Sequence, residues 1–135
     1  MSKTELMVSI ENVKQQNWLG DPLNLSTQQL DGSYMSVHAD VTDLVKSFLR
    51  ARDNQSGQSL VVKSLEDSER VRVIGMALRD TTNGVLQMPF GEHKWLVDKA
   101  KEVGWRFLPN DASIFIEALQ AGQKANVPAP VLVIE

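Results

Sequence analysis

The chain has 135 residues, of which 42% are hydrophobic and 23% are charged, and its formal net charge is −3. These values are typical of one soluble globular domain that can bury a core without disulfides or a structural metal. The sequence has no cysteine, which excludes thiol nucleophiles, disulfides, iron–sulfur clusters and zinc sites built on thiolate.

The distribution of apolar and charged residues indicates where the protein works. The N-terminus lacks a continuous apolar stretch of signal-peptide length, and the longest apolar runs fall far short of the ~20 residues that a membrane-spanning helix needs. We therefore predict a cytoplasmic protein. The excess negative charge lies in residues 1–68, whereas residues 69–135 are balanced. Because neither half is a basic tail, we expect no general affinity for nucleic acid or anionic membranes.

The first elements expected are two strands separated by a polar segment. Apolar and other residues alternate over residues 6–11, which is the period of a strand with one buried face. Residues 34–39 alternate in the same way and place Met35 on the apolar face. Between the two strands, residues 14–32 are rich in Gln, Asn, Ser and Asp. We predict a long irregular segment there, with room for one short helical turn.

The clearest helix begins after Asp40. Its apolar residues recur at the spacing of one helical stripe: Val41, Leu44, Val45, Phe48 and Leu49. The Asp40 carboxylate is well placed to cap the helix, and Asp43 adds negative charge at the positive end of the helix dipole.

The middle of the chain is β-rich. Residues 60–62 and 71–78 are predicted to form strands, and the apolar parity changes beside Gly75, which favours a bulge. Thr82-Asn83-Gly84 is typical of a tight hairpin turn. Residues 85–88 then form the partner strand of that hairpin.

Two further helices and two strands complete the prediction. Residues 92–103 form an amphipathic helix that stops at Gly104, and residues 105–108 form a short strand. A third helix starts at Pro109-Asn110-Asp111 and ends at Gly122. Residues 131–134 close the chain as a strand. The order is roughly ββ-α-βββ-α-(β)-α-β, so we predict one α+β domain over residues 1–135, with a mixed, largely antiparallel sheet and about three helices packed on it.

Candidate catalytic groups are sparse. Neither of the two histidines, His38 and His93, lies near a Gly-x-Ser-x-Gly elbow, and the glycines are too scattered for a phosphate-binding loop. His38, Asp40 and Asp43 could share a divalent metal, and Glu92-His93-Lys94 has the Glu-x-Lys pattern of a class of metal-dependent nuclease. The same carboxylates equally suit helix N-termini. We predict no catalytic residue, no metal site and no cofactor.

Apolar side chains in the polar segment are the first candidates for binding a partner. Trp18, Leu19, Leu23 and Leu25 are isolated apolar residues within residues 14–32. Such residues either fasten the segment to the body or form an exposed contact patch. The closing strand could likewise pair within its own sheet or across a dimer edge.

Two other groups of residues could bind anionic partners. Arg70 and Arg72 would lie on one face of a strand, where they could bind an anionic ligand or an acidic partner, or simply face water. Trp95 and Trp105 lie among basic residues and could stack on single-stranded nucleic acid. Against that reading, the basic residues stand three or four positions from acidic ones, as on a solvated helix: Lys94, Lys99, Lys101 and Arg106.

The second half of the chain resembles a GNAT acyltransferase. The resemblance rests on the run at residues 73–80, a hairpin, a helix, a short strand and then Asn110-Asp111-Ala112. It implies acyl-CoA binding, in which a glycine-rich loop at a helix N-terminus holds the pyrophosphate. The corresponding stretch, residues 87–93, departs from the family pattern because Pro89 removes a donor and Glu92 places a negative charge where phosphate would lie.

The sequence as a whole favours a non-enzymatic binding domain. The expected partner is another protein or a second copy of the chain. The first alternative is a GNAT-like acyl-CoA binder or acyltransferase with a degenerate cofactor loop, and the second is a nucleic-acid-binding accessory protein. A small-molecule pocket between sheet and helices leaves no sequence motif and stays open.

Overall fold

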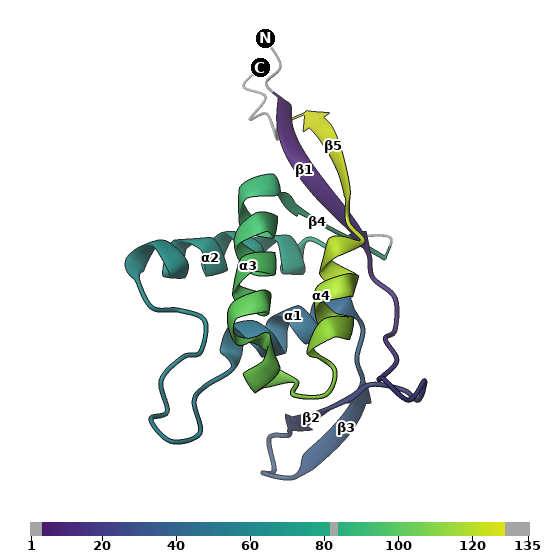
Figure 1. Cartoon of the computed structure of the whole chain (residues 1–135), viewed down its shortest axis with the longest axis vertical. Helices are drawn as coiled ribbons and strands as arrows, with labels where there is room; N and C mark the ends of the chain where they lie inside the picture. Colours follow the sequence, from purple (N-terminus) through teal and green to yellow (C-terminus); the bar gives the residue numbers. More distant parts are fainter. Residues whose placement is uncertain (1–3, 82–83, 129–135) are drawn as a thin grey trace.

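The computed structural model describes residues 4–81 and 84–128 of the chain (Figure 1). Its helices and strands confirm the predicted α+β class. In chain order they are β1 (Thr4–Glu11), β2 (Asn24–Gln28), β3 (Tyr34–His38), α1 (Val41–Arg50), α2 (Leu65–Arg79), β4 (Val85–Pro89), α3 (Phe90–Phe107), α4 (Ala112–Gln120) and β5 (Gln123–Pro128).

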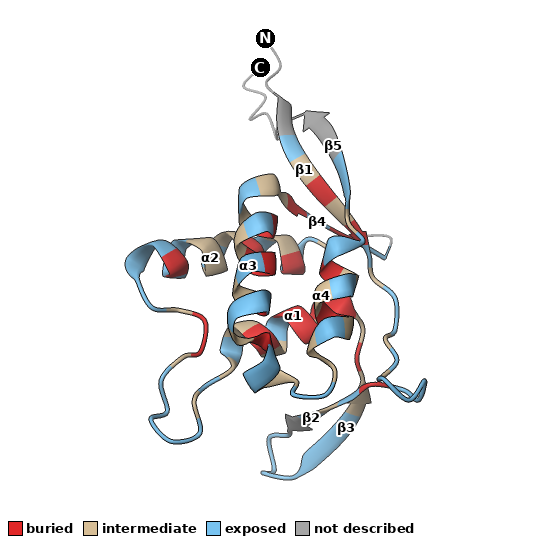
Figure 2. Cartoon of the chain, in the orientation of Figure 1, coloured by how far each residue is buried: buried red, intermediate tan, exposed pale blue. Residues whose placement is uncertain are grey.

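The larger sheet has the order β4-β1-β5, and both pairings are antiparallel. Its residues alternate between a buried face and an outer face, as the sequence of β1 predicts. Among the described side chains, the buried face includes Val8, Ile10, Leu86 and Met88. The helices cover this face, and Figure 2 shows the buried residues where the strands meet them. On the outer face, the Gln87 side chain donates to Ser9 Oγ at 3.1 Å.

Three aromatic rings join α1, α3 and α4 in the centre of the core. The ring centroids of Phe48 and Phe115 are 5.1 Å apart, and Phe107 lies 5.4 Å from Phe48 and 5.8 Å from Phe115. Phe48 and Phe115 are fully buried. The pairs are tilted or edge-on, which is the arrangement that aromatic quadrupoles favour.

A second, two-stranded sheet is formed by β2 and β3. This hairpin lies at the opposite end of the molecule from the β1–β5 ribbon (Figure 1). The prediction of an irregular segment without strands at residues 14–32 is therefore wrong, because that segment contains β2. The sequence of β2 has only one large apolar residue, Leu25, and so gives little strand signal; pairing with β3 supplies its backbone hydrogen bonds.

Helix α1 has the predicted cap. Asp40 Oδ1 accepts a hydrogen bond from the Asp43 backbone N–H at 2.9 Å, and Asp43 Oδ2 accepts one from the Asp40 backbone N–H at 3.2 Å. This reciprocal capping box satisfies two donors that the helix end would otherwise leave free.

Helix α2 replaces the strand predicted at residues 71–78, and that prediction is wrong. Ser64 caps the helix by accepting from the Asp67 backbone N–H at 3.1 Å. Ile74 and Leu78 lie one helical turn apart and are buried, so the change of parity beside Gly75 is a helical period rather than a bulge. Core packing on this stripe outweighs the lower helix propensity of the β-branched residues. Helix α2 thus replaces the first strand of the predicted hairpin, whereas the partner strand is present as β4. Two of the predicted turn residues, at 82–83, lie outside the described residues.

The strand predicted at residues 60–62 is also absent. The backbone N–H groups of Val61 and Val62 donate to Ser59 Oγ at 3.2 and 3.0 Å. Because a side chain satisfies these donors, the segment is held without a neighbouring strand. Val61 is nevertheless fully buried, so its apolar character reports packing rather than strand formation.

Helix α3 is longer than predicted. It continues through Gly104 to Phe107, so the short strand expected at residues 105–108 does not form. Glycine inside a helix costs about 1 kcal/mol relative to alanine, but the added turn places Phe107 in the aromatic cluster, which offsets that cost. The third predicted helix is confirmed as α4. The closing strand predicted at residues 131–134 lies outside the described residues, and β5 at Gln123–Pro128 is a strand that the sequence reading missed.

Gly122 is required for the close approach of the chain after α4 to strand β1. A Cβ at this position would collide with Val8 Cγ1 and lie 3.1 Å from Ile10 Cγ1, both on buried side chains. We expect Gly122→Ala to lower the free energy of unfolding by about 1–3 kcal/mol, the usual cost of overpacking. Urea denaturation measures this change.

The matched control is Gly75→Ala in α2, because no atom outside its own stretch of helix lies within 4 Å of the Cβ position there. This variant should gain about 0.5–1 kcal/mol from helix propensity. Equal effects of the two alanines would contradict the steric account of Gly122.

Candidate interaction surfaces

The apolar residues of the polar segment divide between the two predicted roles. Leu23 is buried and Leu25 packs against the core, so these two fasten the segment to the body. Trp18 and Leu19 are 62% and 63% exposed at a turn. The Trp18 backbone N–H donates to Asp111 Oδ1 at 2.9 Å, which fixes this turn beside the start of α4.

The β2–β3 hairpin exposes further apolar side chains. Leu30 at its turn is fully exposed, and Tyr34 and Met35 of β3 are 71% and 50% exposed. Figure 2 shows β3 exposed along most of its length. The predicted alternation of β3 is correct, but Met35 is not buried because this part of the strand extends beyond the body. Sequence reading missed Leu30 and Tyr34; the apolar Leu30 directly before the Asp31-Gly32 turn was the available signal.

The hairpin is uncharged along both strands. Neither Asn24–Gln28 nor Tyr34–His38 contains Asp, Glu, Lys or Arg. Proteins usually protect free sheet edges with lysine or other charged residues, or with proline. The residues of the two strands lack that protection although 23% of the chain is charged. At the His38 end of the outer edge, Lys14 Nζ donates to the His38 carbonyl at 2.9 Å.

The outer edge of β3 carries free backbone groups. The Ala39 N–H donates to the Leu23 carbonyl at 2.8 Å and the Gln29 N–H donates to the Ser33 carbonyl at 2.7 Å. In an antiparallel ladder, hydrogen-bonded pairs alternate with non-hydrogen-bonded pairs. The backbone groups of Tyr34 and Ser36 therefore point away from β2, and β2 is the only strand paired with β3 in the described part of the chain.

Local hydrogen bonds stiffen the hairpin turn. Asp31 Oδ1 accepts from the Ser33 hydroxyl at 2.6 Å and from the Ser33 backbone N–H at 2.9 Å. These bonds lower the pKa of the Asp31 carboxyl below its usual value. Gly32 has φ of +88°, a conformation that side-chain-bearing residues rarely adopt. The turn thus presents the neighbouring Leu30 in a defined position.

The two arginines expected on one strand face, Arg70 and Arg72, lie instead on helix α2 and point in different directions. Arg70 is half-buried and its Nη1 lies 3.2 Å from Glu92 Oε1, while its Nη2 lies 3.9 Å from Glu66. Arg72 is exposed. Because successive residues of a helix point 100° apart, the two side chains diverge, and the predicted shared face is wrong.

Trp95 belongs to a buried polar network rather than to an open stacking surface. Its indole N–H donates to Asp67 Oδ1 at 2.9 Å, and Asp67 Oδ2 accepts from the Lys63 backbone N–H at 2.9 Å. Lys99 Nζ lies 3.5 Å from the same carboxylate. Burial by itself raises the pKa of Asp67, but these donors outweigh it and lower the pKa.

The remaining residues of the proposed nucleic-acid surface are mostly paired. Lys94 lies 3.7 Å from Asp98, and Arg106 pairs with Asp53. Trp105 is 60% exposed and its indole N–H donates to the Glu102 carbonyl at 3.2 Å. The structure therefore exposes Trp105 on a helix whose Lys94 and Arg106 already pair with carboxylates.

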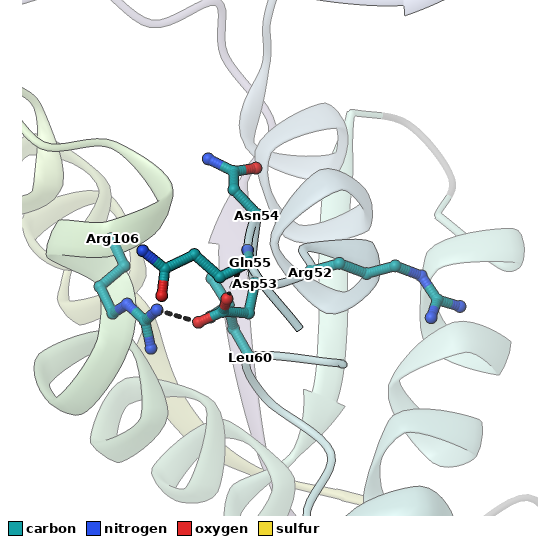
Figure 3. Close-up of a pocket in the computed structure, with 6 residues that line it drawn as sticks. All are labelled: Arg52, Asp53, Asn54, Gln55, Leu60 and Arg106. Atoms are coloured by element: carbon teal, nitrogen blue, oxygen red, sulfur yellow. Dashed lines mark hydrogen bonds and ion pairs between the residues drawn. The ribbon is translucent and has the colours of Figure 1, made fainter. Parts of the chain in front are cut away.

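A small polar depression of about 250 Å³ surrounds the pair Asp53–Arg106, and Figure 3 shows the residues that line it. Hydrogen bonds from the Ser56 and Gln55 backbone N–H groups, together with Arg106, lower the pKa of Asp53 to about 2. The second guanidinium at this depression, that of Arg52, donates to the Gly57 carbonyl at 3.0 Å. Both arginines thus bind groups of the chain itself, and these contacts hold the loop after α1 in place.

The candidate metal ligands have structural roles. Asp40 and Asp43 form the α1 capping box, and His38 Nε2 lies 2.8 Å from the Gln15 carbonyl. Over residues 4–81 and 84–128, no three His, Cys, Asp or Glu side chains are grouped so that they could hold a metal ion. His93 is buried with Nε2 2.7 Å from the Leu119 carbonyl, a contact that joins α3 to α4.

The backbone lacks the first strand that the acyltransferase resemblance implies. Residues 73–79 of its leading strand belong to helix α2. Strand β4 does run directly into α3 as the resemblance implies, but Glu92 in the first turn of α3 pairs with Arg70. The helix N-terminus is thus already next to a carboxylate.

A basic-rimmed groove between α1 and α2 was not predicted. It encloses about 260 Å³, and its lining residues are Lys46, Leu49, Arg50, Val71, Gly75, Leu78 and Arg79. Finding it required knowing that α2 is a helix, because only then does Arg79 face α1.

None of the described helices is long and apolar enough to cross a membrane. Comparisons of the chain with protein-family models, with characterised proteins and with solved structures found no match.

Proposed function

We propose that this protein is an interaction domain that self-associates through the outer edge of β3. The observation that carries the proposal is the β2–β3 hairpin, which has free backbone groups at Tyr34 and Ser36 on its outer edge, no charged residue in either strand, and exposed apolar side chains at Leu30 and Met35. A lone two-stranded hairpin is marginally stable in water, so adding strands would stabilise it.

A second copy of β3 fits this edge in sequence and in backbone pattern. Antiparallel pairing about Ser36 sets Ser36 opposite its own equivalent, Met35 opposite Val37, and Tyr34 opposite His38. The outward N–H and C=O groups of Ser36 would form the hydrogen-bonded pair on the two-fold axis. No like charges would meet across the new ladder, and Met35 and Val37 of both copies would share one face.

The test compares two serines that pair with each other across the hairpin. Ser26 and Ser36 are directly opposite and both are exposed. In the proposed dimer, the two copies of position 36 would be about 5.5 Å apart, whereas the copies of position 26 would be three strand spacings, about 14 Å, apart. Only the first distance is well within the Debye length of ~8 Å at physiological salt.

We expect Ser36→Lys to weaken dimerisation by about tenfold or more, because it places like charges opposite each other. The matched Ser26→Lys variant should keep the dimer. Sedimentation velocity over a concentration series measures both, with circular dichroism as the check that each variant is folded. A wild-type chain that stays monomeric at every concentration would overturn the proposal, and so would equal weakening by the two lysines.

A further inference from the structure

The groove between α1 and α2 combines an apolar floor with a purely cationic rim. Leu49, Val71 and Leu78 contribute the apolar side chains, and Leu78 is buried. The charged lining residues are Lys46 and Arg50 of α1 and Arg79 of α2, and all three are exposed. No carboxylate lines the groove, although the chain as a whole has net charge −3.

The three cations are not neutralised within the described chain. The ion pairs among residues 4–81 and 84–128 involve Arg70, Lys94, Lys99 and Arg106. Lys46, Arg50 and Arg79 form none of them. The contrast with α3 is informative, because three cations there have a carboxylate partner. No ion pair among the described residues neutralises the positive charge of the groove, so this charge can attract an anionic partner.

Gly75 opens the floor of the groove. It lies inside α2, where glycine is the least favourable helix residue after proline. No atom outside its own stretch of helix lies within 4 Å of the position of a Cβ. Any larger side chain there would project into open space in the groove, so the glycine leaves room for an occupant.

We propose that the α1–α2 groove binds an acidic peptide segment of a partner protein, with an apolar anchor side chain over Gly75 and carboxylates on both sides. Cations on both walls suit several carboxylates spaced along a chain better than one isolated anion. The groove is partly open to solvent, as peptide-binding grooves are, whereas small-molecule sites enclose most of their ligand.

The probe for this proposal is a short fluorescein-labelled peptide in which pairs of leucine alternate with pairs of glutamate. Fluorescence anisotropy with the full chain should show binding that weakens as salt rises, because exposed charges are screened. Two control peptides define the chemistry: one has lysine in place of glutamate, and the other has serine in place of leucine. Neither should bind measurably.

Variants then locate the site. Lys46→Glu/Arg50→Glu should weaken binding by about tenfold or more, whereas Lys94→Glu/Lys101→Glu makes the same change of net charge on α3 and should have little effect. Gly75→Leu should abolish binding by filling the floor while keeping or raising the melting temperature, because leucine favours helix.

The outcomes separate this site from the hairpin. Ser36→Lys should bind the acidic peptide as the wild type does, whatever it does to dimerisation. Absence of binding, equal binding of the serine-containing peptide, or equal losses in the α1 and α3 double variants would each overturn the proposal.

Discussion

The Phe48→Ala variant should unfold with a free energy about 3–5 kcal/mol lower than that of the wild type, the usual loss for a buried phenylalanine. Phe48 is fully buried and contacts the rings of Phe107 and Phe115 at 5.4 and 5.1 Å. Its removal would leave a cavity where three helices meet, and the neighbouring rings cannot collapse into it without moving α3 or α4. Urea denaturation with an unchanged m-value measures the loss.

Trp105→Ala is the matched control for this prediction. It also truncates a helical aromatic side chain, but Trp105 is 60% exposed on α3. We expect a change within about 0.5 kcal/mol, as for other surface substitutions. Similar losses in the two variants would show that the aromatic cluster does not hold the helices together.

The Asp67→Asn variant should lose about 2–4 kcal/mol, because a carboxylate that accepts three donors is replaced by an amide with donors of its own. Asp67 is buried and receives the Lys63 backbone N–H, the Trp95 indole N–H and the Lys99 ammonium. The amide nitrogen would face one of these donors. Asp98→Asn, which removes only an exposed pair with Lys94, should cost at most about 1 kcal/mol.

The same carboxylate gives a pH test with a definite sign. The pKa of Asp67 in the folded chain is below 3.8, its ordinary value. Its stabilising contribution is therefore complete above about pH 3.8 and is lost as pH falls through the lower, folded pKa. The wild type should lose more stability than Asp67→Asn as pH is lowered through this window. Parallel curves of unfolding free energy against pH would contradict the assigned network.

The sequence predicted an element correctly where the element's own residues supply its caps and its apolar face. Helix α1 has its cap at Asp40, its first-turn carboxylate at Asp43 and one apolar face, and the structure has all three. For the same reason, the sequence predicted the strands β1 and β3 from their alternation and the start of α4 from its first residues. The partner-binding residues were only partly predictable: Trp18 is exposed as one reading required, whereas Trp95 and Arg70 are held in networks whose partners come from distant parts of the chain.

The sequence by itself determined the α+β class and the capped helix α1, because each depends on periodicity and on neighbours within a few residues. Only the tertiary structure decided that the β-branched run of α2 is helical, since the core accepts Ile74 and Leu78 as one stripe. It also decided that α3 passes through Gly104 to place Phe107, and that Arg79 lies across a groove from Lys46 and Arg50. These outcomes depend on contacts between segments far apart in the chain, which outweigh local propensities of about 1 kcal/mol or less per residue.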